Sequence, residues 1–264
     1  MPTAEVILFF SGTGNTRLAA HRMAEALGET HCTELLRSEE RPAIEADSVL
    51  GILFPVYAWG IPKMFRQALE ELEVKGRPRY VYAVCTCGDD TGTTAQELRT
   101  LLQKKGLALD AIASVQMPET YVALPGFGLD TKAEALRKLQ EACHRLDQLA
   151  ARIGREEKFS ETVPGGMPWL KSHAIKPVFY ACLISDRLFH VTDACNLCGK
   201  CQRACPVGNI RLRDGHPQWA GQCTGCLACY HRCPQAAIHY GKRTKGKGQY
   251  EIDNLTKQLP PTKR

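Results

Sequence analysis

The chain has 264 residues, of which 44% are hydrophobic, so it can form one large and one small globular domain. The formal net charge of +6 is uneven: residues 191–264 contain 12 Lys and Arg against 4 Asp and Glu, whereas the first 190 residues contain 22 against 24. No basic segment precedes the first apolar residues, and the apolar stretch 169–191 has no uncharged run longer than residues 177–185. We therefore expect no signal peptide, no transit peptide and no membrane span, and a cytoplasmic location.

Thirteen cysteines are too many for a protein that uses cysteine only as a small hydrophobic residue. Eight of them lie between Cys195 and Cys233. Because the cytoplasm keeps thiols reduced, this clustering favours metal ligation over disulfides. Cys32, Cys143 and Cys182 have no partner motif, and we expect them to be core or surface thiols.

Residues 1–153 alternate short apolar runs with amphipathic segments, which is the pattern of a parallel sheet covered by helices. The predicted strands are residues 6–10, 31–36, 49–54, 80–85 and 111–117. The predicted helices are residues 15–27, 62–72, 93–105 and 131–153. Parallel strands need crossovers of about this length, so we expect an α/β domain with a doubly wound, five-stranded parallel sheet.

The first predicted strand runs directly into a loop of small and hydroxylated residues, Ser11, Gly12, Thr13, Gly14, Asn15 and Thr16, after which a helix begins. Backbone N–H groups and the helix dipole favour a phosphate at such a helix N-terminus. The side chains of Ser11, Thr13, Asn15 and Thr16 add donors that suit a terminal phosphate such as that of FMN. No Walker lysine follows, which argues against ATP or GTP.

A dinucleotide is the competing ligand for this loop. Gly12 and Gly14 begin a GxGxxG pattern, and Glu34 lies about where a ribose-binding acid would stand. However, Arg17 replaces the third glycine. A bridging pyrophosphate needs close backbone approach, so FMN is the favoured ligand.

With this loop after its first strand, the N-terminal part resembles the flavodoxins. The resemblance implies a flavodoxin-like fold that binds FMN at the carboxyl ends of the strands. A second loop at a strand end consists of Pro55, Val56, Tyr57, Ala58, Trp59 and Gly60. The family pattern places an aromatic ring of this loop, here Tyr57 or Trp59, beside the flavin. The alternative is that both aromatic rings pack the loop against a domain interface.

A third loop, residues 85–89, matches the flavodoxin loop that contacts the edge of the flavin ring through backbone groups. Thr86, Cys87 and Gly88 are the predicted contacts. Flavodoxins need no thiol here, so Cys85 and Cys87 are either redox-active, a site for a flavin adduct, or structural. We expect a buried strand-end residue at Cys85 and a small loop residue at Cys87.

Residues 154–190 are predicted to be a linker and packing helix between two domains. Residues 154–167 are charged and then rich in Pro and Gly, as expected of a connector. In residues 169–191 apolar side chains recur at helical spacing, with a break near Pro177. We expect this segment to pack one domain onto the other.

Residues 191–241 contain two cysteine motifs of identical spacing. The first consists of Cys195, Cys198, Cys201 and Cys205 followed by proline, and the second of Cys223, Cys226, Cys229 and Cys233 followed by proline. The offset of 28 residues continues to Ile210 and Ile238, which indicates an internal duplication. Zinc sites pair two short spacings instead, so structural zinc is the less favoured alternative.

This pattern resembles that of the bacterial two-cluster ferredoxins, which implies a small α+β domain with two 4Fe-4S clusters. In such motifs the cysteine before proline binds the other cluster. Cluster one would then be bound by Cys195, Cys198, Cys201 and Cys233, and cluster two by Cys223, Cys226, Cys229 and Cys205. Each oxidised cluster with its thiolates carries roughly −2, which reduces the basic surplus of this region and argues against nucleic acid as a partner.

Together, residues 1–153 and 191–241 resemble the flavodoxin-ferredoxin fusion proteins of anaerobic bacteria and archaea. We expect an electron carrier that interconverts one- and two-electron chemistry and exchanges electrons with redox partner proteins. One alternative is an FMN-dependent reductase of a small organic substrate fed by the clusters. Another is a redox-sensing regulator, which no DNA-binding motif supports. No histidine spacing or Ser-His-Asp set indicates a catalytic residue.

The last segment, residues 242–264, is basic and contains Gly and Pro. We expect it to lie on the surface as a strap. Docking of an acidic redox protein is its alternative role.

Overall fold

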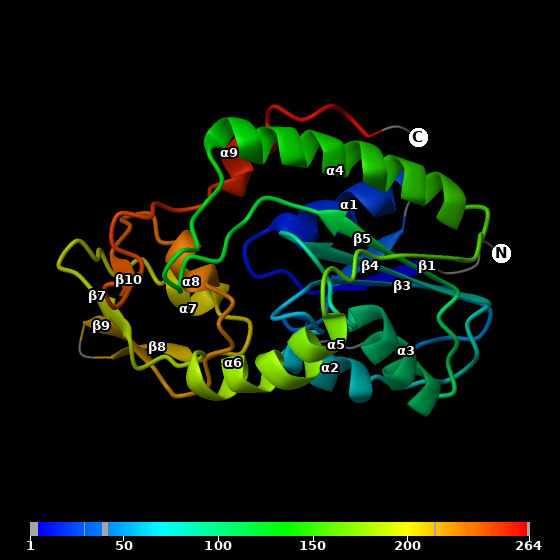
Figure 1. Cartoon of the computed structure of the whole chain (residues 1–264), viewed down its shortest axis with the longest axis horizontal. Helices are drawn as coiled ribbons and strands as arrows, with labels where there is room; N and C mark the ends of the chain where they lie inside the picture. Colours follow the sequence, from blue (N-terminus) through cyan, green and yellow to red (C-terminus); the bar gives the residue numbers. More distant parts are fainter. Residues whose placement is uncertain (1–4, 29, 39–41, 214, 263–264) are drawn as a thin grey trace.

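The computed structural model describes residues 5–28, 30–38, 42–213 and 215–262. Two parts lie side by side along its long axis (Figure 1): a larger α/β part and a smaller part that carries the two cysteine motifs. In the part of the chain that the structure describes, no helix is both long and apolar enough to cross a membrane.

The larger part is built on one sheet. Its strands are β1 (Glu5–Phe9), β2 (His31–Glu34), β3 (Val49–Pro55), β4 (Tyr80–Cys87), β5 (Ala111–Gln116) and β6 (Phe159–Glu161). They lie in the order β2-β1-β3-β4-β5-β6, and all five pairings are parallel. The order 2-1-3-4-5 is that of flavodoxin-like sheets. The predicted flavodoxin-like fold is therefore confirmed.

The sixth strand is an addition to the five-stranded prediction. β6 pairs Phe159 with Ala111 at the free edge of β5, inside the segment that was predicted to be a linker. β6 has only three residues, of which one is apolar, and so short a strand shows no alternating pattern in the sequence. The Arg152 guanidinium lies 4.1 Å from the centre of the Phe159 ring and helps to hold the strand at the edge.

Two helices cover each face of the sheet (Figure 1). α1 (Asn15–Leu27) and α4 (Lys132–Ile153) pack on one face, and α2 (Lys63–Glu70) and α3 (Thr94–Lys104) on the other. All four predicted helices are confirmed. Every residue of β4 is buried and only the last residue of β3 is not, because helices cover both faces of these central strands.

The smaller part consists of two short antiparallel ribbons and two short helices. β7 (Phe189–Val191) pairs with β10 (Ile238–Tyr240), and β8 (Ile210–Arg213) pairs with β9 (His216–Trp219). The helices α7 (Lys200–Ala204) and α8 (Ala228–His231) lie within the two cysteine motifs and begin 28 residues apart. This is the small α+β domain that the duplication predicted.

The duplication extends to the backbone of the cysteine loops. Leu197 and Gly225 are equivalent positions, with φ values of 58° and 72°, and so are Gly199 and Leu227, with 70° and 54°. In each pair one residue is glycine and the other leucine, yet both are left-handed. The left-handed conformation costs a leucine roughly 1–2 kcal/mol, so the preference of the residue does not set these turns. The turns follow instead from the need to bring successive cysteine side chains to one site.

One bent helix connects the two parts. α5 (Pro168–Leu170), the π-helical turn η1 (Lys171–Ile175) and α6 (Lys176–Cys182) follow one another without a break. Pro177 has no N–H to donate to the preceding turn, and a π turn at this place absorbs the defect. Lys176 forms an ion pair with Glu97 at 2.8 Å, while Ile184, just beyond the helix, lies against Gly225 of the smaller part. This segment therefore contacts both parts.

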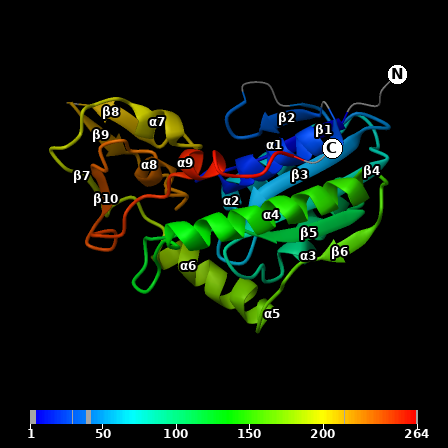
Figure 2. The same ribbon diagram turned by 90° about the horizontal axis from the view of Figure 1, so that it is seen from above.

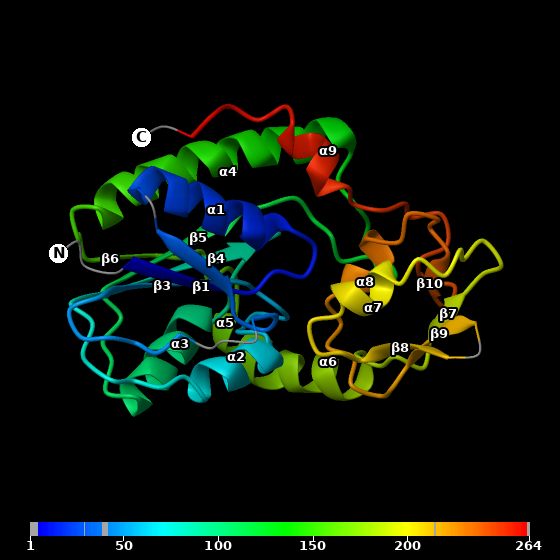
Figure 3. The ribbon, with the colours of Figure 1, turned by 180° about the vertical axis from the view of Figure 1, so that it is seen from behind.

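The C-terminal segment returns from the smaller part to the larger one. The views of Figures 2 and 3 show α9 (Ile252–Thr256) beside α1 and α4, and the chain continuing along them. The Tyr250 hydroxyl donates to Asn15 Oδ1 at 2.7 Å, and Arg22 donates to the carbonyls of Pro260 and Pro261 at 3.0 and 3.2 Å. Leu255 is buried with the core of α1 and α4. The predicted strap is thus anchored at the beginning of α1 and along its length.

Candidate cofactor sites

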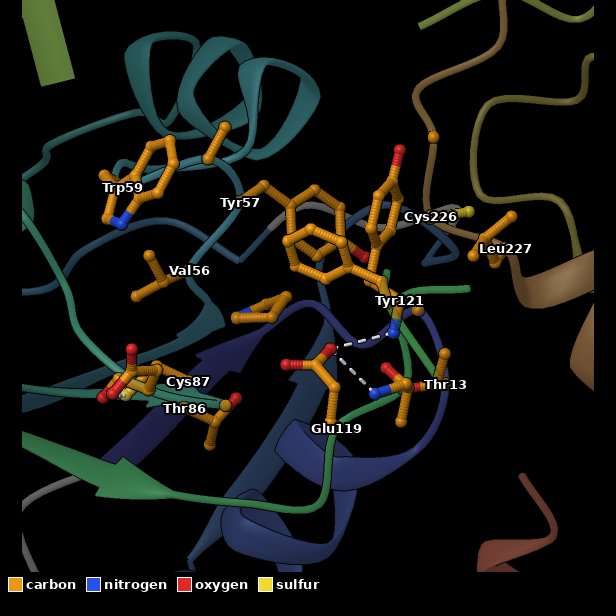
Figure 4. Close-up of a pocket in the computed structure, with 18 of the residues that line it drawn as sticks. Thr13, Val56, Tyr57, Trp59, Thr86, Cys87, Glu119, Tyr121, Cys226 and Leu227 are labelled. Carbon is orange, nitrogen blue, oxygen red and sulfur yellow. Dashed lines mark hydrogen bonds between the residues drawn. The ribbon is translucent and has the colours of Figure 1, made fainter. Parts of the chain in front are cut away.

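A cavity of about 520 Å³ lies at the carboxyl ends of β1, β3 and β4, where the larger part faces the smaller one. Its volume is within the usual range for small-molecule sites. Most of the predicted cofactor-binding residues line it: Ser11, Gly12, Thr13, Asn15, Thr16, Pro55, Val56, Tyr57, Ala58, Trp59, Thr86, Cys87 and Gly88. Gly14 and Gly60 are the two that do not. Figure 4 shows side chains from all three loops around the cavity.

The loop after β1 is held in shape by its own side chains. Ser11 Oγ accepts a hydrogen bond from the Gly14 N–H at 3.1 Å, and the hydroxyls of Thr16 and Thr86 lie 2.8 Å apart. Gly14 has φ of 114°, and a Cβ there would collide with Ile252, so only glycine fits. The Asn15 side chain donates to the Pro118 carbonyl at 3.0 Å and accepts from Tyr250. Asn15 therefore positions the loop, and the unpaired N–H groups of the first turn of α1 remain for an anion.

The two residues that decide between a dinucleotide and a monophosphate, Arg17 and Glu34, form an ion pair outside the cavity. Arg17, at the place of the third glycine, forms an ion pair with Glu34 at 2.9 Å, and Arg37 approaches the same carboxylate at 3.2 Å. Glu34 does not line the cavity. The acid that would bind a ribose is thus engaged with two arginines, which supports the monophosphate interpretation.

The two aromatic residues of the second loop take different positions. Tyr57 packs edge-on against Phe10, with ring centres 6.0 Å apart, and its hydroxyl lies beside Gly12. Burial raises the pKa of the Tyr57 phenol well above its ordinary value, and the nearby Cys226 thiol adds to this. Tyr57 therefore lines the cavity and also touches the smaller part, so both roles considered for it are compatible with its place.

Trp59 lies at the end of the cavity that the connecting helix covers. The Lys171 ammonium is 5.5 Å from the centre of the Trp59 ring, and Ser172 Oγ donates to the Trp59 carbonyl at 2.8 Å. Lys171 also forms an ion pair with Asp90 at 2.5 Å. These contacts fasten the π-helical turn over the second and third loops.

The thiols of the third loop are protonated and inert. Cys85 is fully buried and its thiol donates to the Ala113 carbonyl at 3.5 Å, while burial raises its pKa. Burial, together with the nearby Asp89 and Asp90 carboxylates, raises the pKa of Cys87 to about 12. Because the thiolate is the reactive form, neither side chain is a nucleophile at neutral pH. The structure favours the structural role that the sequence predicted for both.

Sequence reasoning missed a fourth wall of the cavity. It comes from the loop after β5, including Pro118, Glu119 and Tyr121, and from α6, including Phe179. Glu119 points toward the cavity in Figure 4, and its carboxylate accepts from the N–H groups of Thr120 and Tyr121 at 3.0 and 2.9 Å. The position of this loop at a carboxyl end of the sheet was the available signal. No sequence signal could have revealed the contribution of α6, because it arises from the packing of two segments that are distant in the chain.

Three buried polar atoms of residues that line the cavity have no hydrogen-bond partner within the described chain: Asp90 Oδ1, the Tyr180 hydroxyl and Thr224 Oγ1. The Asp90 side chain is 6% exposed; its Oδ2 atom binds Lys171, and its Oδ1 atom has no hydrogen-bond partner. A buried carboxylate oxygen normally has a donor, so a ligand with an N–H or O–H group at this end would satisfy it. The phosphate loop, the volume and this acceptor together fit a ligand with a terminal phosphate and a polar ring, such as FMN.

In the smaller part the cysteines form two groups of four. Cys195, Cys198, Cys201 and Cys233 line one small cavity. In the other group, burial raises the pKa of the Cys229 thiol well above its ordinary value, and the adjacent Cys226, Cys223 and Cys205 raise it further. Each group takes three cysteines from one motif and the last from the other. This grouping is the one that crossed ligation requires, and the assignment of each cysteine to a cluster stays a prediction.

Equivalent backbone N–H groups point at the crossing cysteines. The Asn209 N–H donates to Cys205 Sγ at 3.2 Å, and the Ala237 N–H donates to Cys233 Sγ at 3.3 Å. Hydrogen bonds to cluster sulfurs are one of the means by which proteins set cluster potentials. Among the described residues, no three Cys, His, Asp or Glu side chains converge as they would around a single metal ion. Two groups of four thiols, each drawn from both motifs, are the arrangement of a two-cluster domain, whereas structural zinc sites pair two short spacings.

The comparison with known families agrees with this interpretation. Residues 194–238 match the family described as 4Fe-4S dicluster domain, and this range contains all eight cysteines of the two motifs. The smaller part is thus a two-cluster iron-sulfur domain.

Among solved structures, the chain is similar to a putative flavoprotein from Bacteroides uniformis ATCC 8492, with 18% identity and a TM-score of 0.32 over 44% of this chain and 93% of that chain. A putative flavoprotein from Bacteroides eggerthii DSM 20697 has 18% identity and a TM-score of 0.32 over 43% of this chain and 88% of that chain. The Trp repressor binding protein from Bacillus subtilis has 13% identity and a TM-score of 0.32 over 56% of this chain and 96% of that chain. No curated protein matches the chain. Likenesses this weak leave the function to be argued from the site.

Proposed function

We propose that the protein transfers electrons between two 4Fe-4S clusters and an FMN bound in the cavity, as a flavodoxin-ferredoxin fusion that works in a reducing cytoplasm. The observation that carries the proposal is the position of Cys226. This cysteine of the second motif lines the same cavity as the phosphate loop. A Cβ atom on Gly12 would be 3.1 Å from the Cys226 carbonyl oxygen, so the two loops are in direct contact.

The residues of the cavity have separate tasks in this proposal. The first turn of α1 binds the phosphate, and Ser11, Thr16 and Asn15 hold the loop that presents its N–H groups. Tyr57 and the apolar side of α6 exclude water from the space between the FMN site and Cys226. When bound, FMN accepts or releases two electrons in single steps while each cluster handles one, which makes the chain a converter between two- and one-electron chemistry.

A reductase that acts on a small organic substrate is the second candidate. It is favoured by the aromatic wall of the cavity, where the rings of Tyr121 and Phe179 lie 5.8 Å apart and Tyr180 is a further lining residue. Burial raises the pKa of Tyr180 to about 12, so its phenol is protonated and able to donate. We prefer the carrier function because electron transfer needs only the clusters and FMN. A reductase would also need the residues of the aromatic wall to bind a substrate and donate a proton.

Anaerobic purification followed by iron, sulfide and flavin analysis tests the proposal. We expect about eight irons, about eight sulfides and one FMN per chain. Zinc in place of iron, or a protein that binds no FMN after reconstitution, would contradict it. Screening small unsaturated acceptors with the reduced protein then separates a carrier from a reductase, because only the reductase would turn them over at a rate that saturates with acceptor.

A further inference from the structure

The two cysteine groups have different surroundings. The group of Cys223, Cys226, Cys229 and Cys205 faces the cavity: Cys226 lines it, and the half-buried Tyr57 lies beside Cys226. The group of Cys195, Cys198, Cys201 and Cys233 lines its own small cavity, which Leu197, Leu212 and Pro217 share. In Figure 1 the β7–β10 and β8–β9 ribbons form the end of the molecule away from the sheet. Cluster two is therefore the inner site and cluster one the outer site.

The outer site is open to solvent beside two exposed leucines. Cys198 is exposed, and Leu197 and Leu212 have exposed fractions of 46% and 38%. A Cβ atom on Gly199, which is itself buried, would lie 3.8 Å from Leu212 and 2.9 Å from the Arg203 guanidinium, so Leu212 and Arg203 both lie beside the loop that carries Leu197 and Cys198. We call Leu197, Cys198 and Leu212 the outer face.

The charged residues around the outer face are mostly basic. Lys200, Arg203, Arg211 and Arg213 are all exposed, and Arg203 donates to the Cys198 carbonyl at 3.0 Å. Asp193 is an exposed acid of the same segment, and Asp214 lies outside the described residues. An apolar centre with a charged rim is the usual composition of a protein interface, and a basic rim attracts an acidic partner.

We propose that the outer face docks a small, acidic, one-electron carrier protein and that electrons enter or leave the molecule through cluster one. This inference rests on the proposed function. One electron passes between the partner's redox centre and cluster one, so one is oxidised and the other reduced by a single electron. No bond forms or breaks and no proton is required. Cluster two then lies between cluster one and the cavity.

The arrangement of basic residues around the outer face favours a protein partner over a nucleic acid. A nucleic acid would need a phosphate-binding track, whereas here the basic side chains surround a small apolar centre beside a thiol. The connecting helix offers another exposed apolar surface, with Trp169 and Val178, but it lies on the cavity side and is not next to cluster one. Among the residues that the structure describes, the outer face combines exposed apolar side chains, a basic rim and direct access to a cluster site.

The test uses the full chain loaded with clusters and FMN, and an acidic two-cluster ferredoxin as the probe. Arg211→Glu/Arg213→Glu reverses two exposed charges on β8, and Lys104→Glu/Arg77→Glu makes the same change in net charge on exposed residues of the larger part. Binding is measured by calorimetric titration at low and high salt. We expect the first variant to bind the ferredoxin about tenfold more weakly than the parent at low salt, and the control to bind as the parent does. The difference should shrink at high salt because screening weakens it.

Equal affinity of the parent and the Arg211→Glu/Arg213→Glu variant, or equal loss in the control, would overturn the docking site. Cofactor content and reduction by dithionite are measured on the same samples. If these show clusters and a reducible FMN while the titration shows no effect, the docking inference alone fails. If the protein lacks FMN, the proposed function fails, whatever the titration shows.

Discussion

The two cysteine motifs are copies of each other in spacing and backbone but differ in what they face. The inner group contacts the phosphate loop through Cys226, and the outer group opens to solvent at Cys198. The same contrast appears at the one left-handed leucine of each motif, although the two leucines do not occupy equivalent positions of the repeat. Leu227 is 3% exposed and lines the cavity, whereas Leu197 is 46% exposed. Duplication thus supplied two similar cysteine sites, and the docking of one copy against the sheet gave them different surroundings.

The largest expected difference between the inner and outer groups comes from replacing one cysteine in each. Cys226→Ser and Cys198→Ser should each lose about four of about eight irons. Cys226→Ser should also abolish flavin reduction by an acidic ferredoxin, because the cluster between the outer site and the cavity is gone. Iron analysis and stopped-flow flavin absorbance measure both effects.

Cys182→Ser is the matched control for these variants, because Cys182 is exposed and belongs to neither motif. It should retain all iron and the parent rate. If Cys226→Ser keeps the parent rate of flavin reduction, the assignment of inner and outer clusters is wrong.

Cys205→Ser sharpens the comparison by testing crossed ligation. Cys205 lies in the first motif but its thiol is grouped with Cys223, Cys226 and Cys229. We expect the electron paramagnetic resonance spectrum of reduced Cys205→Ser to match that of Cys226→Ser and to differ from that of Cys198→Ser. A spectrum like that of Cys198→Ser would show that each motif binds its own cluster.

Leu227→Gly and Leu197→Gly compare the two left-handed leucines. Both substitutions relieve about 1 kcal/mol of backbone strain. Leu227→Gly also removes a buried side chain, which costs about 2–5 kcal/mol, so this variant should be destabilised by a few kcal/mol. Leu197→Gly loses little burial and should be neutral or slightly stabilised. Chemical denaturation under anaerobic conditions measures the difference, and equal effects at the two positions would contradict the contrast in burial.

Gly12→Ala should give the smallest effect, at the contact between the inner motif and the phosphate loop. A Cβ atom there would be 2.5 Å from the Tyr57 hydroxyl and 3.1 Å from the Cys226 carbonyl, so the neighbours must shift. We expect FMN binding to weaken by about 1–2 kcal/mol, or about tenfold, in a fluorescence titration of the apoprotein. Gly128→Ala is the control, because a Cβ at Gly128 meets no atom within 4 Å. FMN affinity equal to that of the parent would remove Gly12 from the site.

The sequence predicted the elements whose signal is local. Strand alternation, helix periodicity and the strand-loop-helix pattern at Ser11 to Thr16 depend on neighbouring residues, and the four helices and five strands appear where they were expected. The cysteine spacing likewise predicted the cluster domain, because the geometry of a cluster constrains consecutive thiolates. The short edge strand β6 was missed because three residues carry no periodic signal.

By itself, then, the sequence determined the flavodoxin-like sheet, the two-cluster domain and the loops that line the cavity, since each follows from short-range pattern. Only the tertiary structure decided which copy of the cysteine motif faces those loops. It also decided that Lys171, Asp90 and Tyr250 belong to the surroundings of the cavity. These contacts join segments more than 80 residues apart, and they depend on how two packed surfaces fit, which no local pattern encodes.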